Sequence, residues 1–206
     1  EPGIKDEPQH LKQGKITLPL LEAMNIAYRI LPDNDQEARV CLEMLLDESV
    51  KSNTPVALVV RKGTFGQYAM QKTTDDGHLS FTREEAISRI VSNLGESDII
   101  VSTTGRTSRE LYEYRERLGD GHSRDFLTVG SMGHASQIAM GIALNKPLRQ
   151  VFCLDGDGSV LMHMGAMAII GSEKVNNFKH IIFNNGVHDS VGGQPTAGSC
   201  VSFTEK

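Results

Sequence analysis

The sequence contains no long hydrophobic run, which argues against a membrane protein. Its longest apolar candidate, residues 164–170, ends at Gly171 and is followed by charged Glu173. A bilayer-spanning helix needs about 20 apolar residues. Residues 1–6 also lack the basic start and apolar core of a signal peptide. We therefore expect no membrane partner and a cytoplasmic location.

Cysteines are few, and positive charge is not in excess. The three cysteines, Cys41, Cys153 and Cys200, show no CxxC spacing, which favours a reducing compartment. Cys153 stands in an apolar run and is predicted to be a buried thiol. The formal net charge of -5 gives no electrostatic reason to expect nucleic acid as a partner. An anionic substrate would need a local cationic pocket.

Short apolar segments alternate with helical patterns along the chain. With 39% hydrophobic and 23% charged residues, the composition is that of a globular protein. The alternation predicts an α/β fold in which a parallel sheet is flanked by helices. The strand candidates are residues 25–31, 55–60, 98–102, 150–154 and 180–184.

Apolar spacing predicts helices around residues 38–49 and 87–94, the second of them preceded by a Thr82 to Glu85 capping box. Three more helices are expected: one after Ser108 with an N-cap from Thr107 or Ser108, and one each over residues 134–144 and 161–174.

A polar, glycine-containing stretch at residues 63–79 is predicted to be a linker. Residues 80–206 would then form one domain. Residues 1–62 contain only about two strands, too few for an independent sheet, so they are predicted to be the carboxyl-terminal part of another domain.

Residues 155–158, Asp-Gly-Asp-Gly, follow a buried strand and open a helix, where an open α/β sheet binds ligands. The glycines allow a phosphate to approach the backbone, and Asp157 offers a hard oxygen to magnesium. A plain strand-ending turn is an equal alternative for this pattern alone. The next strand ends in Asn184-Asn185-Gly186, and its separation from Asp157 fits a strand-helix-strand crossover. The side chains of Asp157 and Asn185 would therefore emerge at the same edge of the sheet.

Together, Gly156-Asp157-Gly158 and Asn184-Asn185 resemble the motif of thiamine-diphosphate enzymes. The resemblance implies a thiamine-diphosphate-binding fold and Mg²⁺ ligation by Asp157, Asn185 and the Val187 carbonyl. It also implies contacts to the cofactor from Gly156, Gly158 and Ser159.

Two upstream segments match further positions of this family. In residues 129–134, Met132 would wedge the cofactor into its bent shape and the Gly130 carbonyl would accept a hydrogen bond from its pyrimidine. The alternative is a core methionine in a loop that opens a helix. Residues 103–108 match the family's first diphosphate loop, with contacts implied for Thr104, Gly105 and Thr107.

Residues 156–165 and 184–196 resemble the family branch that decarboxylates phosphonopyruvate to phosphonoacetaldehyde and carbon dioxide. Sulfopyruvate as the small 2-oxo-acid substrate, or a non-catalytic phosphate-binding module, are the alternatives. His188 and His134 are the implied catalytic histidines, with His163 a third candidate. Candidate cations for the phosphonate are Lys5, His10, Arg106 and His188.

The sequence departs from the family in two respects. No match is visible for the glutamate motif that activates the cofactor, and the chain stops soon after Asn185. We therefore expect a fragment of a two-domain enzyme, inactive alone. Because such enzymes build each active site between two subunits, the resemblance implies a homo-oligomer.

Overall fold

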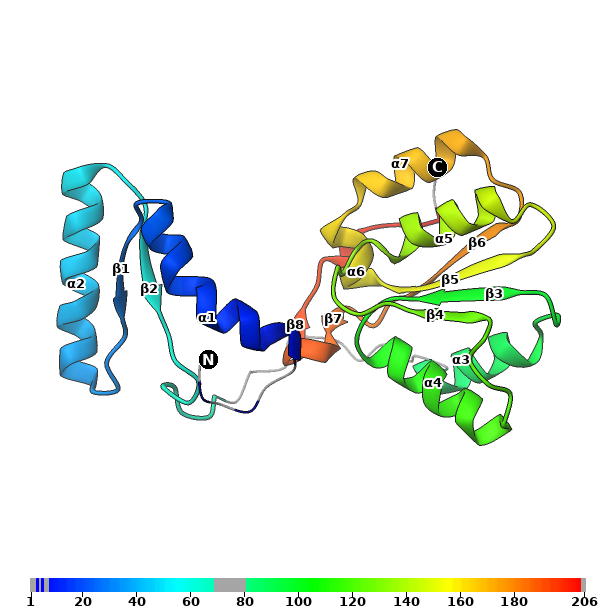
Figure 1. Ribbon diagram of the computed structural model, residues 1–206, viewed down its shortest axis with the longest axis horizontal. Helices are drawn as coiled ribbons and strands as arrows, with labels where there is room; N and C mark the ends of the chain where they lie inside the picture. The colour runs from blue at the N-terminus through cyan, green and yellow to red at the C-terminus, as the bar shows by residue number, and fades with distance from the viewer. Residues whose placement is uncertain (1–2, 4, 6–7, 69–80, 205–206) are drawn as a thin grey trace. The chain divides into compact units, whose positions relative to one another are not determined.

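The computed structural model describes residues 3, 5, 8–68 and 81–204, which fall into two compact units, Glu1–Lys72 and Thr73–Lys206 (Figure 1). The division lies within residues 63–79, the segment predicted to be a linker, of which 69–79 are outside the described residues.

The first unit contains a two-stranded parallel sheet and two helices: α1 (Pro8–Ala23), β1 (Ala27–Ile30), α2 (Asp35–Ser52) and β2 (Val56–Val59). Both strand predictions are confirmed with shorter bounds. The helix predicted around residues 38–49 is present as α2, which buries Leu45 but leaves Leu42 and Leu46 exposed. Helix α1 was not predicted. Its Leu11, Ile16 and Leu20 are all exposed, so no buried apolar stripe reveals the helix in the sequence.

The second unit is built on four parallel strands in the order β4-β3-β5-β6, which confirms the predicted α/β class. They are β3 (Ile99–Ser102), β4 (Asp125–Leu127), β5 (Val151–Gly156) and β6 (Phe178–Phe183). Strand β4 was not predicted, because it has three residues, lies at the sheet edge and leaves Phe126 exposed.

Helices cover both faces of this sheet, with α3 and α4 on one side and α5 and α7 on the other (Figure 1). On the α5 face, Val101 and Cys153 pack with Ala139. On the α3 and α4 face, Ile100 and Leu154 pack with other buried residues of those helices. Successive side chains of a strand alternate between the two cores, so both cores require apolar residues and the strands read as nearly continuous apolar runs.

The helices of this unit are α3 (Arg83–Ser92), α4 (Arg106–Leu118), α5 (Ala135–Asn145), α6 (Asp157–Met162) and α7 (Gly165–Glu173). The capping box of α3 is confirmed, since the Thr82 side chain accepts from the Glu85 amide and the Glu85 side chain accepts from the Thr82 amide. None of the helices in the described part of the chain is both long and apolar enough to cross a bilayer.

Two helix predictions are wrong. The segment 161–174 is not one helix, because β5 runs directly into α6 at Asp157 and α6 ends at Met162, before α7 begins at Gly165. Helix α4 is not capped by Thr107 or Ser108. It begins earlier, at Arg106, and its N-cap is Gly105, whose φ of 99° is accessible to glycine and which provides no side-chain cap.

After β6 the chain forms a small hairpin and two short 3₁₀ turns. Strand β7 (Val187–His188) pairs antiparallel with β8 (Gln194–Pro195), and η1 (Asp189–Val191) lies between them. The second turn is η2 (Gly198–Cys200). We refer to residues 184–198 as the closing segment.

Candidate active site

A cavity lies where β3, β5 and β6 end and lead into the loops that follow them. Most of the residues predicted to bind metal or cofactor line it together. They are Thr104, Thr107, Met132, Gly156, Asp157, Gly158, Ser159, Asn185, Val187 and His188. The parallel register explains this convergence, because Gly156 of β5 pairs with Phe183 of β6 and the chain leaves both strands at the same edge.

Three predicted site residues are not in the cavity lining. Gly105 lies against the closing segment, where a Cβ would be 2.5 Å from the Ser190 hydroxyl. The Gly130 amide donates to the Thr104 hydroxyl at 3.2 Å, which joins its loop to the loop after β3. His134 instead packs its ring on that of His163, with centroids 4.6 Å apart.

Asp157 is the first residue of α6, and only 2% of its surface is exposed. The Thr196 hydroxyl donates to its Oδ2. Its Oδ1 accepts no hydrogen bond from a side chain that the structure describes. Burying a carboxylate is costly unless its charge is compensated. A bound divalent cation is one way to supply that compensation.

The two asparagines after β6 are held by hydrogen bonds at the base of the closing segment. Asn184 donates to the Gly198 carbonyl at 2.9 Å and accepts from the Gly186 amide at 3.2 Å. The Asn185 side-chain oxygen accepts from the Val187 amide at 3.2 Å. Asn184 thus ties the two ends of the closing segment together, while Asn185 and Val187 line the cavity.

These groups form a donor set that fits magnesium. Asp157 supplies a carboxylate, Asn185 an amide oxygen and Val187 a main-chain carbonyl, and all three residues line one cavity. Magnesium prefers hard oxygen ligands and commonly shares them with phosphate oxygens. No sulfur or imidazole is needed for such a site.

The Ser159 hydroxyl joins three loops at the floor of the cavity. It is 2.9 Å from the Thr103 hydroxyl and accepts from the Gly133 amide at 3.0 Å. Ser159 is buried, as is Thr103. The hydroxyl is therefore engaged in contacts within the protein.

Gly158 is closely packed by two side chains of the closing segment. A Cβ there would be 2.6 Å from Nδ1 of His188 and 3.2 Å from a methyl carbon of Thr196. The imidazole therefore lies directly against the turn that carries Asp157. The sequence prediction had His188 directly after the expected metal-ligating carbonyl of Val187. It did not indicate the contact between His188 and Gly158.

Charged residues at the cavity include two, Arg83 and Asp189, to which the sequence prediction gave no role. Arg83 and Asp189 line the cavity beside Arg106, and Asp189 is paired with both arginines, at 3.3 Å from Arg83 and 3.4 Å from Arg106. The contact between Arg83 and Asp189, which lie 106 residues apart, joins the start of α3 to η1, and the sequence pattern does not specify such a contact.

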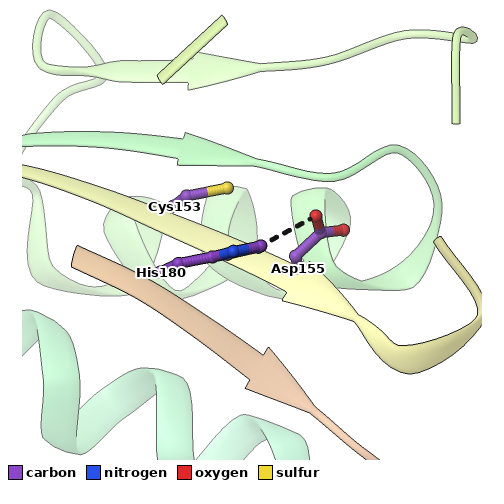
Figure 2. Close-up of side chains that lie close together, drawn as sticks. All are labelled: Cys153, Asp155 and His180. Carbon is purple, nitrogen blue, oxygen red and sulfur yellow. Dashed lines mark hydrogen bonds and ion pairs between the residues drawn. The ribbon is translucent and has the colours of Figure 1, made fainter. Parts of the chain in front are cut away.

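A buried polar pair lies below the Asp157 turn. His180 of β6 is 3.3 Å from the Asp155 carboxylate, and Cys153 lies beside them on β5 (Figure 2). Asp155 also accepts from the Gly156 amide at 3.0 Å, at the start of the turn. Burial, and then the charge of Asp155, raise the pKa of the Cys153 thiol well above its ordinary value. Cys153 is therefore a protonated core thiol, as its apolar context predicted.

Residues 103–205 match the family described as "Thiamine pyrophosphate enzyme, C-terminal TPP binding domain". This match spans the loop after β3, the Asp157 turn and the closing segment. The chain belongs to the thiamine pyrophosphate enzyme family. Within this family, the cavity is located in the part of the chain that the family description names as the cofactor-binding domain.

Among relatives with a described activity, a phosphonopyruvate decarboxylase of Streptomyces viridochromogenes is 36% identical over 98% of this chain. Another, of Streptomyces hygroscopicus, is 37% identical over 98%. The sulfopyruvate decarboxylase subunit beta of Methanocaldococcus jannaschii is 42% identical over 55% of the chain and 57% of its own length. The matches cover 53% and 52% of the two Streptomyces proteins, so the chain spans about half the length of these curated relatives.

Proposed function

We propose that the complete protein is a thiamine-diphosphate- and Mg²⁺-dependent decarboxylase of phosphonopyruvate, releasing phosphonoacetaldehyde and carbon dioxide. The observation that carries this proposal is the convergence of Asp157, Asn185 and Val187 at one cavity. Similarity to the two phosphonopyruvate decarboxylases over 98% of the chain supports the choice of reaction. Thiamine diphosphate, when bound, supplies a ring that accepts the electrons left by the departing carbon dioxide.

The metal would be held by Asp157, the Asn185 side chain and the Val187 carbonyl. This assignment is supported by the near-complete burial of Asp157 and by the hydrogen bond from Thr196, which engages Oδ2 and leaves Oδ1 for the cation. Thr196 would fix the carboxylate rotamer. An oriented ligand binds more tightly, because less side-chain freedom is lost on binding.

The diphosphate would be bound by the loops after β3 and β5. Thr104, Gly105 and Thr107 would contribute from the first loop, and Gly156, Gly158 and the Ser159 main chain from the second. Main-chain amides at the starts of helices favour anions. Gly130 would accept a hydrogen bond from the pyrimidine through its carbonyl, and Met132, which lines the cavity, would support the bent form of the cofactor.

His188 is the proposed catalytic histidine, since it lines the cavity and its ring packs on the Gly158 turn. There it would hold or transfer a proton beside the cofactor. Arg106 lines the same cavity and would attract an anionic group. His134, packed on His163, would act from the edge of the Met132 loop. Lys5 and His10, the other candidate cations, belong to the first unit.

Sulfopyruvate is a second candidate substrate. It is favoured by the 42% identity to the subunit beta of a sulfopyruvate decarboxylase, although that match covers only 55% of the chain. Phosphonate carries more negative charge than sulfonate near neutral pH, so the two acids would differ in how strongly they require cations in the site.

Turnover of phosphonopyruvate, sulfopyruvate and pyruvate by the complete protein tests these alternatives directly. We expect thiamine diphosphate and Mg²⁺ to be required together and phosphonopyruvate to give the highest kcat/KM. Preference for sulfopyruvate would change the substrate assignment. Tight binding of the cofactor without release of carbon dioxide from any of the three acids would indicate a non-catalytic phosphate-binding module.

The remaining proposals concern the complete protein. Residues 1–62 would be the end of the pyrimidine-binding domain, residues 63–79 a linker and residues 80–206 the diphosphate-binding domain. We propose a cytoplasmic homo-oligomer acting in phosphonate biosynthesis, supported by the cysteine pattern and the family resemblance. Separation by size and mass measurement of the complete protein would test the oligomer.

A further inference from the structure

We propose that Arg83 and Asp189 are positioning residues, which hold the part of the closing segment that carries the Val187 carbonyl and His188 against the cation site. This inference rests on the proposed cofactor and metal site. It adds an ion-pair chain, from Glu110 through Arg83 to Asp189, as a determinant of Mg²⁺ affinity. None of these three residues belongs to the glycine and asparagine motifs of the cavity.

The chain begins inside the folded body of the unit. Arg83, the first residue of α3, makes a two-pronged contact with Glu110 of α4, with Nε at 2.8 Å from Oε2 and Nη2 at 2.6 Å from Oε1. Their side chains are 19% and 15% exposed. A bidentate arginine–carboxylate pair of this kind fixes the guanidinium in one plane, so Arg83 is a rigid anchor.

The anchor then reaches the closing segment. Nη2 of Arg83 donates to Oδ2 of Asp189 at 3.3 Å, and Nη1 of Arg106 is 3.4 Å from the same oxygen. Asp189 is the residue after His188 and the second after Val187. Fixing its carboxylate therefore restrains the main chain immediately after both groups that would act at the cation site.

The residues on either side of Asp189 each lie against a glycine of another loop. His188 lies against Gly158, and Ser190 lies against Gly105. In both contacts a side chain packs closely against a glycine. Such packing positions the side chain but supplies little attraction. The Asp189 ion pairs provide attraction between these two contacts. The strand pairing here is short, since β7 and β8 contain two residues each.

The geometry predicts a specific set of effects on the complete protein. Arg83→Met and Asp189→Asn should each weaken Mg²⁺ binding, measured by calorimetry with saturating thiamine diphosphate, by about tenfold, the lower end for outer-shell partners of metal ligands. The double variant should bind Mg²⁺ about as weakly as Asp189→Asn alone, because Asp189→Asn already removes the ion pair with Arg83 together with the one from Arg106. Arg83→Lys should retain part of the affinity, since lysine keeps the charge and loses the bidentate contact.

Arg115→Met is the matched control. Arg115 is a more deeply buried arginine of the same unit, paired with Asp125 at 3.0 Å and Asp120 at 2.7 Å, and none of the three lines the cavity. Its removal should lower the thermal stability and leave Mg²⁺ affinity unchanged. If weaker Mg²⁺ binding resulted only from a general loss of stability, Arg115→Met would lose at least as much affinity as the Arg83 variants.

Hydrogen exchange of the protein without cofactor gives an independent readout. Main-chain amides of residues 188–193 should exchange faster in Arg83→Met and Asp189→Asn than in the parent, and should be unaltered in Arg115→Met. Because Asp189 lies on a half-exposed turn, Asp189→Asn keeps the test decisive if Arg83→Met does not fold.

A parent that binds cofactor and metal, with variants that bind equally tightly and exchange at parental rates, would overturn this inference alone. Additive losses in the double variant would also overturn it. Failure of the parent to bind thiamine diphosphate and Mg²⁺ would instead overturn the proposed function, and with it the effect on the metal.

Discussion

The Asp157 turn and the closing segment meet at one cavity, but they are held by different kinds of interaction. The turn ends β5, which lies between β3 and β6 and pairs with β6 along all six of its residues. The closing segment has two short strands and is fixed mainly by side chains. Asn184 donates a hydrogen bond to the Gly198 carbonyl, the Thr196 hydroxyl donates one to Asp157, and Asp189 forms an ion pair with Arg83.

This difference separates two ways of losing the site. At the Asp157 turn the sheet holds the main chain, so a substitution there should remove chemistry and leave the shape. In the closing segment the side chains hold the main chain, so a substitution there should change the shape of the site as well. The following variants test this distinction, and the expected effect on binding or stability becomes smaller from one to the next.

The largest effect is expected from Asp157→Asn. The amide keeps the size of the side chain and the sheet keeps the turn, so the fold should persist while the buried charge is lost. Loss of an outer-shell partner alone weakens metal binding by about 10–100-fold. We expect Mg²⁺ affinity to fall by at least about 100-fold by calorimetry, with the thermal midpoint maintained or raised. Parental affinity would show that Asp157 is not a metal ligand.

Gly105→Ala tests the contact between the first loop and the closing segment. Gly105 has a φ of 99°, and an added Cβ would lie 2.5 Å from the Ser190 hydroxyl oxygen. Strain of this kind costs about 1–3 kcal/mol. We expect a loss of stability in that range by denaturant unfolding, together with weaker cofactor binding. Combining it with Ser190→Gly should recover the part due to the clash, but not the part due to φ.

Gly141→Ala is the control of opposite sign. Gly141 lies within α5, and an added Cβ there would meet nothing within 4 Å. Alanine is favoured over glycine in a helix interior by about 1 kcal/mol, so this variant should be more stable than the parent. Equal losses at the two positions would show that the φ of Gly105 and its contact with Ser190 carry no special cost.

Thr196→Val removes the hydroxyl that bonds Asp157 and nearly preserves the volume. Because Thr196 orients the proposed metal ligand, Mg²⁺ affinity should fall by about tenfold. Thr196→Ser retains the hydroxyl and should recover most of the affinity. If Thr196→Val and Thr196→Ser bind Mg²⁺ equally tightly in a titration, the Thr196 hydroxyl does not orient the Asp157 carboxylate.

The same difference explains how much could be predicted from the sequence. The buried strands and the Asp157 turn follow from short apolar runs and glycines, which are local patterns. The sheet then brings Asp157 and Asn185 to one cavity, as their positions after neighbouring strands indicated. These features were predictable because parallel strands deliver their carboxyl ends to the same edge.

The closing segment was predictable only in its motif. Thr196, Arg83 and Asp189 act through contacts with residues far away in the sequence, and no pattern of spacing marks such contacts. His134 illustrates the converse. It follows a motif loop, yet its ring packs on His163 rather than lining the cavity. Side-chain direction at the start of α5 decides this, and periodicity does not specify it.

The smallest effect is expected at the capping box, where Arg83 begins α3. The Thr82 main-chain amide, and then the Thr82 side chain, hold the pKa of Glu85 below its ordinary value of 4.5. A lowered pKa means that the carboxylate stabilises the fold above the unfolded pKa and that this contribution is lost as the pH falls through the folded pKa. Glu85→Gln should therefore lower the thermal midpoint slightly at pH 7, and the difference from the parent should shrink as the pH falls below 4.5 and vanish below the lowered pKa of Glu85 in the folded protein. If Mg²⁺ affinity at pH 7 also falls in this variant, loss of the capping box loosens the first turn of α3. Arg83 then holds Asp189 of the closing segment less firmly. An unchanged affinity would show that the bidentate contact with Glu110 suffices to hold Arg83 in place.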